Sequence, residues 1–427
     1  MATGGPSERE FDVVLYGASG FVGKLTAQHI AQSAPDYARI AVAGRSARKL
    51  QAVLDEIGGV AHTWPIIEAD AEDPGSLAEM AARTRVVVTT VGPYAKYGLP
   101  LVEACVNAGT DYADLTGEQL FVRDTIERFH ERAQETGSRI VHSCGFDSVP
   151  SDLNVYQIFQ QALADDAGEL GDTTLYVKAL RGGMSGGTVA SGRRQMEREA
   201  EDPALAQVVK DPYTFSTDRE LEPDLGSQPD SGFGKASDID PELKGWTATF
   251  LMAPYNTRIV RRTNGLLGWA YGKQFKYREV MGTGSSVAAP ILAAATSGGL
   301  GAMWKFGPTL FKRAPKKIID RILPAPGSGP SEEARLKGFF VIETYAQTSS
   351  GARYKSTFAQ QGDPGYAATA VMLGEAGLCL ALDRDKLSAL TGVITPAAAM
   401  GDALPRRLRA AGVKLETERV AERSTVS

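Results

Sequence analysis

The stretch VVLYGASGFVG, residues 13–23, decides the fold of the first part of the chain. Its first four residues form an apolar run, and Gly17, Gly20 and Gly23 follow at a spacing of three. The next residues, FVGKLTAQHIAQSA (21–34), have the periodicity of a helix. In such a unit the first glycine permits a tight turn, the second lets backbone N–H groups approach a pyrophosphate, and the third lets the helix pack on the strand. We therefore predict a dinucleotide site, with a glycine-rich turn that binds no ligand as the alternative.

The alternation of strand and helix continues through the first 150 residues. Four apolar runs predict buried strands, and helical patterns separate them. Strands that are apolar on both faces are typical of a parallel sheet covered by helices on both sides. We therefore predict an α/β fold whose first domain is a Rossmann-like doubly wound parallel sheet. The four runs are FDVVLYG (11–17), RIAVAGR (39–45), WPIIEAD (64–70) and RVVVTTVGPY (85–94).

The end of the second strand indicates which dinucleotide binds. A site that prefers NAD places Asp or Glu there for the ribose 2′-hydroxyl, but this chain has Arg45 and Ser46 and no carboxylate. A guanidinium can hold a 2′-phosphate with two hydrogen bonds and stack on adenine. We therefore predict NADP(H), with a solvated surface arginine as the alternative. Asp70, which ends the third strand, is a candidate for binding the adenine amino group or for capping the next helix.

The fourth strand ends in VGPYAKYGLP (91–100), which predicts the nicotinamide end of the site. Ligands of an open α/β sheet lie outside the carboxyl ends of its strands, so Gly92 and Pro93 are expected beside the nicotinamide. Tyr94 is the predicted catalytic proton donor, and a packing aromatic residue is the alternative.

Two further groups of polar residues follow strands of the first domain. Asp114, Thr116 and Glu118 lie in a turn, where they contact a substrate or cap the helix that starts at residue 119; we favour capping. A nucleophile pair of Cys144 and His142 is disfavoured, because no third group that would orient the histidine is visible.

Composition excludes several other classes of protein. The 427 residues are 43% hydrophobic and 23% charged, which is typical of two or three soluble globular domains. The net charge is −5 and no basic stripe with aromatic residues occurs, so we expect no nucleic-acid partner. Three scattered cysteines predict neither a disulfide framework nor a metal site. The polar first ten residues lack the apolar region of a signal peptide, which favours a cytoplasmic protein.

The second half of the chain predicts an inserted α+β domain. We expect residues 1–154 to form the nucleotide-binding domain, helices within 361–427 to complete it, and residues 155–360 to form a substrate or interaction domain. Residues 337–366 predict two antiparallel strands. Residues 280–304 contain no charged side chain, and we expect a helix hairpin that is buried in the protein or at a homodimer interface, rather than a membrane span.

A basic cluster follows this uncharged segment. It could contact an anionic surface such as the inner face of the plasma membrane, and an ordinary solvated face is the alternative. The cluster consists of Lys305, Lys312, Arg313, Lys316, Lys317 and Arg321.

Six motifs together resemble the saccharopine dehydrogenase-like oxidoreductases, in particular their mycobacterial trans-acting enoyl reductase branch. The resemblance implies a nicotinamide cofactor and an enoyl thioester substrate, carried by a polyketide synthase without a working enoyl reductase domain, in the biosynthesis of phthiocerol-type lipids and phenolic glycolipids. It also implies cofactor contacts at Gly17, Ser19, Gly20, Phe21, Val22, Gly23 and Arg45. The motifs are GASGFVG, AGRS, VGPYAKYGLPLVEACVNAGTDYADLTGE, CGFDSVPSDL, GGMSGGTVAS and GDPGYAATAVMLGEAGLCLA.

The resemblance implies hydride transfer to C3 of the enoyl thioester and proton transfer to C2, with negative charge developing on the thioester oxygen. We expect Tyr94 to donate the proton, N–H groups of the glycine-rich loop 182–188 to stabilise the oxyanion, and residues 280–304 to line an acyl groove. A saccharopine-type amino-acid reductase is an alternative that would need Arg or Lys clamps for carboxylates within 155–360. A non-catalytic, membrane-associated scaffold that binds NADP is the third interpretation, and it would tolerate Tyr94→Phe.

Overall fold

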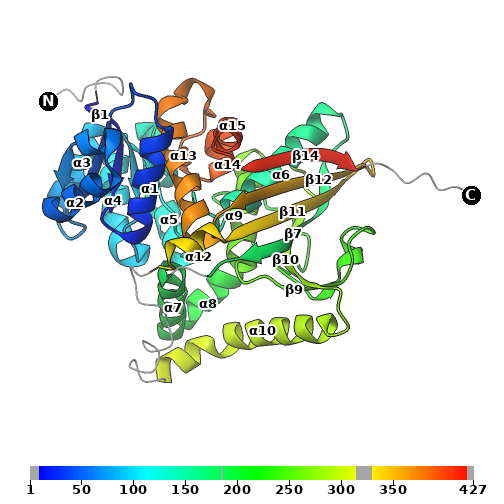
Figure 1. Cartoon of the computed structure of the whole chain (residues 1–427). Coiled ribbons are helices and arrows are strands. Elements are labelled where there is room, and N and C mark those ends of the chain that lie inside the picture. The colour runs from blue at the N-terminus through cyan, green and yellow to red at the C-terminus, as the bar shows by residue number, and fades with distance from the viewer. Residues whose placement is uncertain (1–8, 184–185, 314–328, 421–427) are drawn as a thin grey trace, which may run out of the picture.

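Two seven-stranded sheets and the helices around them make up the structure (Figure 1). The computed structural model describes residues 9–183, 186–313 and 329–420. The first sheet has the order β13-β6-β5-β4-β1-β2-β3, and all its strand pairs are parallel, as predicted. Its strands are β1 (Phe11–Tyr16), β2 (Ile40–Gly44), β3 (Ile66–Glu68), β4 (Thr84–Thr89), β5 (Asp111–Ala113), β6 (Arg139–Val141) and β13 (Gly392–Ile394).

Both faces of this sheet are buried, because side chains of each strand alternate between two hydrophobic cores. Val13 and Leu15 pack into the core that contains α1, α2, α6 and α13, whereas Val14 and Tyr16 pack into the core that contains α3, α4 and α5. β1 pairs with β4 on one side and β2 on the other, so the order of strands reverses there and a ligand crevice forms at their carboxyl ends. These helices are α1 (Phe21–Ser33), α2 (Ala47–Ile57), α3 (Pro74–Arg83), α4 (Tyr94–Ala108), α5 (Gln119–Thr136), α6 (Val149–Ala164) and α13 (Thr369–Leu382).

The second sheet is mixed, which confirms the inserted α+β architecture. Its order is β14-β12-β11-β7-β10-β9-β8, with β7 and β10 parallel and the other pairs antiparallel. The predicted strand pair is β11 and β12, with Phe339 opposite Gln361. The strands are β7 (Leu170–Arg181), β8 (Gly234–Lys235), β9 (Trp246–Thr249), β10 (Lys276–Gly284), β11 (Phe339–Thr348), β12 (Arg353–Gln361) and β14 (Lys414–Val420).

The remaining helices pack around the second sheet and between the two sheets. In Figure 1, α10 runs along the lower edge of the molecule, and α7 and α8 lie above it. These helices are α7 (Gly186–Glu201), α8 (Pro203–Lys210), α9 (Ala253–Leu266), α10 (Ala289–Arg313), α12 (Glu332–Leu336), α14 (Pro396–Met400) and α15 (Ala403–Ala410).

The C-terminal region differs from the expected set of helices. Its apolar helix α13 packs on the first sheet, but β13 adds a strand to that sheet and β14 adds a strand to the second. Within the described residues 361–420, the chain therefore contributes to both sheets. A run of three apolar residues such as Gly392–Ile394 becomes a strand because the edge of β6 is open beside it, which periodicity alone does not reveal.

The expected helix hairpin in residues 280–304 is wrong. Val280–Gly284 complete β10, and one continuous helix, α10, follows from Ala289 with much of its surface exposed. Short apolar runs fit strand and helix equally well, and the glycines of α10 do not interrupt it. Among the described residues, one helical segment is long and apolar enough to cross a membrane, Pro364–Leu382, but 78% of it is buried in the protein, where it packs on α1 and the first sheet.

Candidate cofactor and active site

A large cavity lies at the carboxyl ends of β1, β2, β4, β5 and β6 and continues between α7, α8, α9 and α10. Its volume is about 1010 Å³. Pockets for one small ligand measure about 300–1,000 Å³, so this cavity has room for a dinucleotide and part of a second substrate. All the predicted site residues except Ser46 line it: Gly17, Ser19, Gly20, Phe21, Val22, Gly23, Arg45, Asp70, Gly92, Pro93 and Tyr94.

The glycine turn forms a cradle that only glycine can build. Gly17 has a φ of +93°, a conformation that side-chain-bearing residues rarely adopt. A Cβ on Gly23 would lie 2.1 Å from the carbonyl oxygen of Gly17, so α1 could not approach the turn so closely. α1 begins at Phe21, and its N-cap residue, Gly20, offers no side-chain cap. The first turn also has no acidic residue, so its first N–H groups remain available to an anion at the cavity. The turn therefore fits a pyrophosphate.

The adenine end of the cavity carries the predicted cation. Arg45 is exposed at the cavity wall, and no hydrogen bond or ion pair engages it within the described residues. Ser46 is directed away because its hydroxyl caps α2 by accepting from the N–H of Lys49, at 3.4 Å. Asp70 lines the cavity, and the capping of α3 falls to Asp73, whose carboxylate accepts from the N–H of Gly75 at 3.0 Å.

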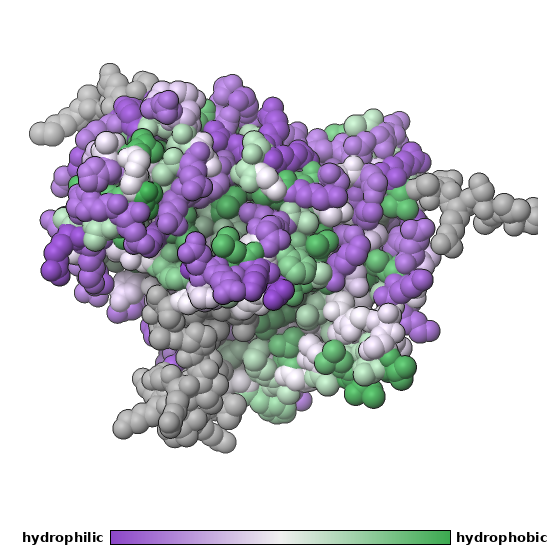
Figure 2. Space-filling model, in the orientation of Figure 1, coloured by the Kyte–Doolittle hydropathy of each residue, from purple (hydrophilic) through white to green (hydrophobic). Residues whose placement is uncertain are grey.

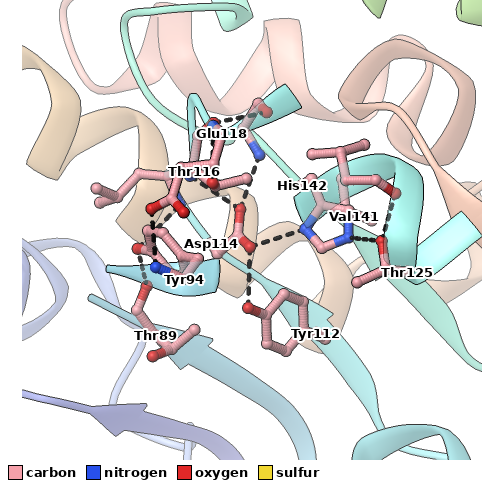
Figure 3. Close-up of polar contacts among 12 residues, drawn as sticks. Thr89, Tyr94, Tyr112, Asp114, Thr116, Glu118, Thr125, Val141 and His142 are labelled. Atoms are coloured by element: carbon pink, nitrogen blue, oxygen red, sulfur yellow. Dashed lines mark hydrogen bonds and ion pairs between the residues drawn. The ribbon is translucent and has the colours of Figure 1, made fainter. Parts of the chain in front are cut away.

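Tyr94 lies at the first turn of α4, with its hydroxyl group directed into the protein (Figure 3). The hydroxyl donates to the carbonyl oxygen of Thr89 at 3.3 Å, and the ring stacks on Phe121. Burial raises the pKa of Tyr94 well above its usual value. Its role as proton donor stays a prediction, and this geometry favours the packing alternative.

Glu118 is a cap, but for a different helix from the one expected. Its two carboxylate oxygens accept from the N–H groups of Tyr94 and Ala95, each at 2.8 Å, at the start of α4 (Figure 3). The hydroxyl of Ser191 on α7 donates to the same carboxylate at 2.7 Å. The carboxylate therefore joins the Rossmann domain to α7, and α5, which it precedes, has no side-chain cap.

Asp114 is the centre of a buried network that shapes the floor of the cavity (Figure 3). It accepts from the hydroxyl of Tyr112 at 2.9 Å, from Nδ1 of His142 at 2.7 Å, and from the N–H groups of Thr116 and Ser143 at 3.0 and 2.9 Å. All these groups are buried.

The disfavoured pair of Cys144 and His142 does not form. Nε2 of His142 contacts Thr125, at 2.8 Å, and Nδ1 contacts Asp114, so both ring nitrogens are engaged. Burial raises the pKa of the Cys144 thiol well above its usual value.

The far part of the cavity is lined by apolar side chains, which suit an acyl chain, together with polar and charged ones such as Gln195, Glu199 and Lys210. Met303 and Trp304 of α10 contribute to it, so only the end of the segment 280–304 lines the groove. Helices α7 and α8 supply much of the wall of the cavity. The sequence did not indicate this contribution, because the fold of the second domain brings these helices to the cavity. Gly182 and Gly183 do not line the cavity, and residues 184–185 of the predicted oxyanion loop lie outside the described part of the chain. The other apolar lining residues include Met196, Ala206, Val209, Leu251, Met252 and Pro254.

Asp147 is a cavity residue that was missing from the predicted site. It lies in the loop between β6 and α6, and its carboxylate is partly exposed in the cavity. Burial raises the pKa of the Asp147 carboxyl to about 6. The motif CGFDSVP (144–150) at the carboxyl end of a strand was the available signal, but nothing in it distinguishes Asp147 from Asp152, which is buried in the protein core.

The fold and the cavity define an NADP-binding α/β oxidoreductase. Residues 13–141 match the family described as Saccharopine dehydrogenase NADP binding domain. Over 96% of this chain and 99% of the other, the structure is similar to apo saccharopine dehydrogenase (L-Glu forming) from Saccharomyces cerevisiae, with a TM-score of 0.53 at 15% sequence identity. This likeness concerns the fold alone.

Full-length relatives define the family more narrowly. A trans-acting enoyl reductase of Mycobacterium ulcerans is 52% identical over 416 residues, covering 97% of this chain and 99% of the relative. One of Mycobacterium tuberculosis (strain ATCC 25618 / H37Rv) is 53% identical over 418 residues, covering 97% of this chain and all of the relative. A second protein of that strain, which is also named as a trans-acting enoyl reductase, is 56% identical over 414 residues. The match covers 97% of this chain and 99% of the relative. The chain belongs to the trans-acting enoyl reductase family.

Proposed function

We propose that this protein reduces the α,β double bond of an enoyl thioester, with NADPH as reductant, while a separate polyketide synthase carries the acyl chain in lipid or glycolipid biosynthesis. When bound, NADPH supplies the hydride that forms the new C3–H bond. The chain's own residues hold the pyrophosphate at the glycine turn and the 2′-phosphate at Arg45. The observation that carries the proposal is the large cavity, which combines this cradle with a group of apolar side chains that suit an acyl chain.

Two guanidinium groups of the cavity are not available to the carboxylates of an amino-acid substrate. Arg258 forms ion pairs with Asp230, and Arg193 pairs with Glu197 on the same helix at 3.0 Å. Both guanidinium groups are therefore already bound to carboxylates, whereas a saccharopine-type site needs cations that can hold the carboxylates of its substrate. This observation favours the thioester over the amino acid.

The assay that tests the proposal combines the purified protein, NADPH and a long-chain trans-2-enoyl thioester of N-acetylcysteamine. We expect NADPH to be consumed and the saturated thioester to appear in equal amounts, as mass spectrometry of the products would show. Consumption of NADPH only with a 2-oxo acid and an amino acid would establish the saccharopine-type alternative. Tight binding of NADPH with no turnover of either substrate would favour the scaffold.

Arg45→Ala is expected to weaken binding of NADPH by about 10- to 100-fold, because the hydrogen bonds of a charged pair contribute about 1.5–3 kcal/mol. Binding of NADH should change little, since NADH has no 2′-phosphate. Fluorescence titration of both nucleotides with the wild-type protein and the variant measures this difference. Equal losses for NADPH and NADH would contradict the assignment of Arg45 to the 2′-phosphate.

We further propose that the protein is cytoplasmic and contacts an anionic membrane surface through α10. Figure 2 shows a hydrophobic area over this helix at the lower edge of the molecule. Val287, just before the helix, is 97% exposed, Ile291 73% and Phe306 58%, and Lys305, next to Phe306 in the chain, is also exposed. Apolar residues with neighbouring cations are typical of interfacial helices. Since Met303 and Trp304 of the same helix line the cavity, this surface would place the acyl groove next to lipid. Lys316, Lys317 and Arg321 lie outside the described residues.

Ile291→Glu combined with Leu292→Glu is expected to reduce binding to phosphatidylglycerol vesicles at least tenfold, because two exposed apolar side chains no longer enter the lipid. Co-sedimentation measures the bound fraction. Tyr37→Glu, at an exposed tyrosine far from α10, is the matched control and should bind as the wild type does. If the double variant changes a dimer into a monomer while vesicle binding is unaffected, α10 is a homodimer interface instead.

A further inference from the structure

The enolate formed during enoyl reduction needs a proton at C2, and the cavity contains few groups free to supply it. Adenine is assigned to the end with Arg45 and Asp70, so the nicotinamide and the substrate lie at the other end, outside β4, β5 and β6. The acids and hydroxyls that line this end include those of Tyr94, Ser143, Asp147 and Tyr255, and Glu118 lies beside it, bound to the N–H group of Tyr94.

Most of these groups are committed to hydrogen bonds inside the protein. The Tyr94 hydroxyl donates to the carbonyl oxygen of Thr89 at 3.3 Å. The hydroxyls of Ser143 and Tyr255 contact one another, and both lie within hydrogen-bond distance of the carbonyl oxygen of Thr116, at 2.9 and 3.1 Å. The protons of these two hydroxyls are therefore used in these contacts, and neither remains to be donated to a ligand. Glu118 is an acceptor for the start of α4 and for α7, so a protonated Glu118 would forfeit those bonds.

Asp147 differs from these groups because no such hydrogen bond holds its carboxylate within the described residues. Among residues 9–183, 186–313 and 329–420, none forms a hydrogen bond or ion pair with its carboxylate. Gly117 borders the carboxylate, and a Cβ added there would lie 3.8 Å from Oδ2, so the lack of a side chain at 117 keeps this side of Asp147 open. Met252, Thr369 and Tyr255 line the cavity around it.

We propose that Asp147 is the catalytic acid that protonates C2 of the substrate. This inference rests on the proposed enoyl reduction. The O–H bond of the Asp147 carboxyl breaks as the C2–H bond forms, and the electron pair of the enolate oxygen restores the thioester carbonyl. The carboxylate that remains takes a proton from water before the next turnover.

The partly desolvated position suits this role. A carboxyl group with an ordinary pKa is almost entirely ionised at neutral pH, but burial raises the pKa of Asp147 to about 6. Tyr255 on α9 interacts electrostatically with Asp147, and the same tyrosine is also influenced by Asp114 and Glu118 in the loop after β5, which are held by the hydrogen bonds described above. A proton donor is active when protonated, so turnover should decline as pH rises through the pKa of Asp147.

The test compares Asp147→Asn with the wild-type protein, using NADPH and the long-chain trans-2-enoyl thioester of N-acetylcysteamine. We expect kcat to fall by about a hundredfold or more, which is the usual contribution of a general acid, and the pH-dependent decline near neutrality to disappear. The affinity for NADPH should stay within a factor of about two, because Asp147 lies beyond the nucleotide contacts. Asp147→Glu should restore part of the activity and its pH dependence, and Asp36→Asn on the exposed surface is the control for a carboxylate substitution as such.

Deuterium labelling distinguishes a chemical role of Asp147 from a structural one. In D2O the wild-type product should carry deuterium at C2 in one configuration, whereas the product of Asp147→Asn, protonated by solvent, should carry it in both. Full activity and unchanged stereochemistry in Asp147→Asn, or loss of both only in Tyr94→Phe, would overturn the assignment. Failure of the wild-type protein itself to reduce the thioester would instead refute the proposed function.

Discussion

Asp114→Ala is expected to lower the free energy of unfolding by about 4 kcal/mol, because breaking a buried charged pair typically costs about 3–5 kcal/mol. The substitution leaves four donors without their acceptor: the hydroxyl of Tyr112, Nδ1 of His142, and the N–H groups of Thr116 and Ser143. All are buried between β5, β6 and α5, where each unsatisfied donor is costly. Urea unfolding monitored by circular dichroism gives the change.

Asp114→Asn serves as the graded comparison. The amide keeps one acceptor oxygen but places an NH2 group against N–H donors, so its loss of stability should lie between those of the wild type and the alanine variant. Asp36→Ala, at an exposed position, should change stability by no more than about 0.5 kcal/mol. If Asp114→Ala unfolds at the same urea concentration as Asp36→Ala, the network around Asp114 does not stabilise the domain.

Gly23→Ala is expected to weaken NADPH binding by about a thousandfold. The new Cβ would lie 2.1 Å from the carbonyl oxygen of Gly17 and 2.9 Å from the Cα of Ala18, and both are backbone atoms that move only with the turn. Displacing α1 removes its first N–H groups from the pyrophosphate. Two charge-assisted hydrogen bonds of about 1.5–3 kcal/mol each account for a loss of this size.

Gly298→Ala in α10 is the matched control, because nothing lies within 4 Å of the Cβ that it adds. It should bind NADPH normally and gain slightly in stability, by about 0.5–1 kcal/mol, as expected for glycine to alanine inside a helix. Fluorescence titration gives the affinities, and circular dichroism shows whether each variant is folded. A folded Gly23→Ala variant with wild-type affinity would mean that the turn does not contact the phosphates.

Local patterns were sufficient to predict the first domain. The apolar runs at β1, β2, β3 and β4 and the helices between them follow from residue order, because a strand covered on both faces is apolar throughout. The glycine turn and Arg45 could also be located, since both lie at the carboxyl end of a strand and line the cavity.

The same reasoning was wrong where contacts between distant segments decide the outcome. Val280–Gly284 became part of β10 because β7 and β9 pair with it, and β13 formed because β6 offered an open edge. Glu118 precedes α5 in sequence but caps α4, because the turn after β5 brings its carboxylate under Tyr94 and Ala95. Sequence spacing does not predict a contact between residues that such a turn brings together.

The sequence by itself determined the fold class and the nucleotide that binds, because these depend on short motifs whose residues act within one strand–turn–helix unit. It also determined the family, because six motifs along the chain carry the resemblance. The tertiary structure alone decided which polar groups remain free in the cavity. Tyr94 and Asp147 both follow strands of the same sheet, yet packing directs the Tyr94 hydroxyl to the carbonyl oxygen of Thr89 and leaves the Asp147 carboxylate facing the cavity. A side chain's hydrogen-bond partners come from every element packed around it, so its availability for chemistry is a property of the assembled fold.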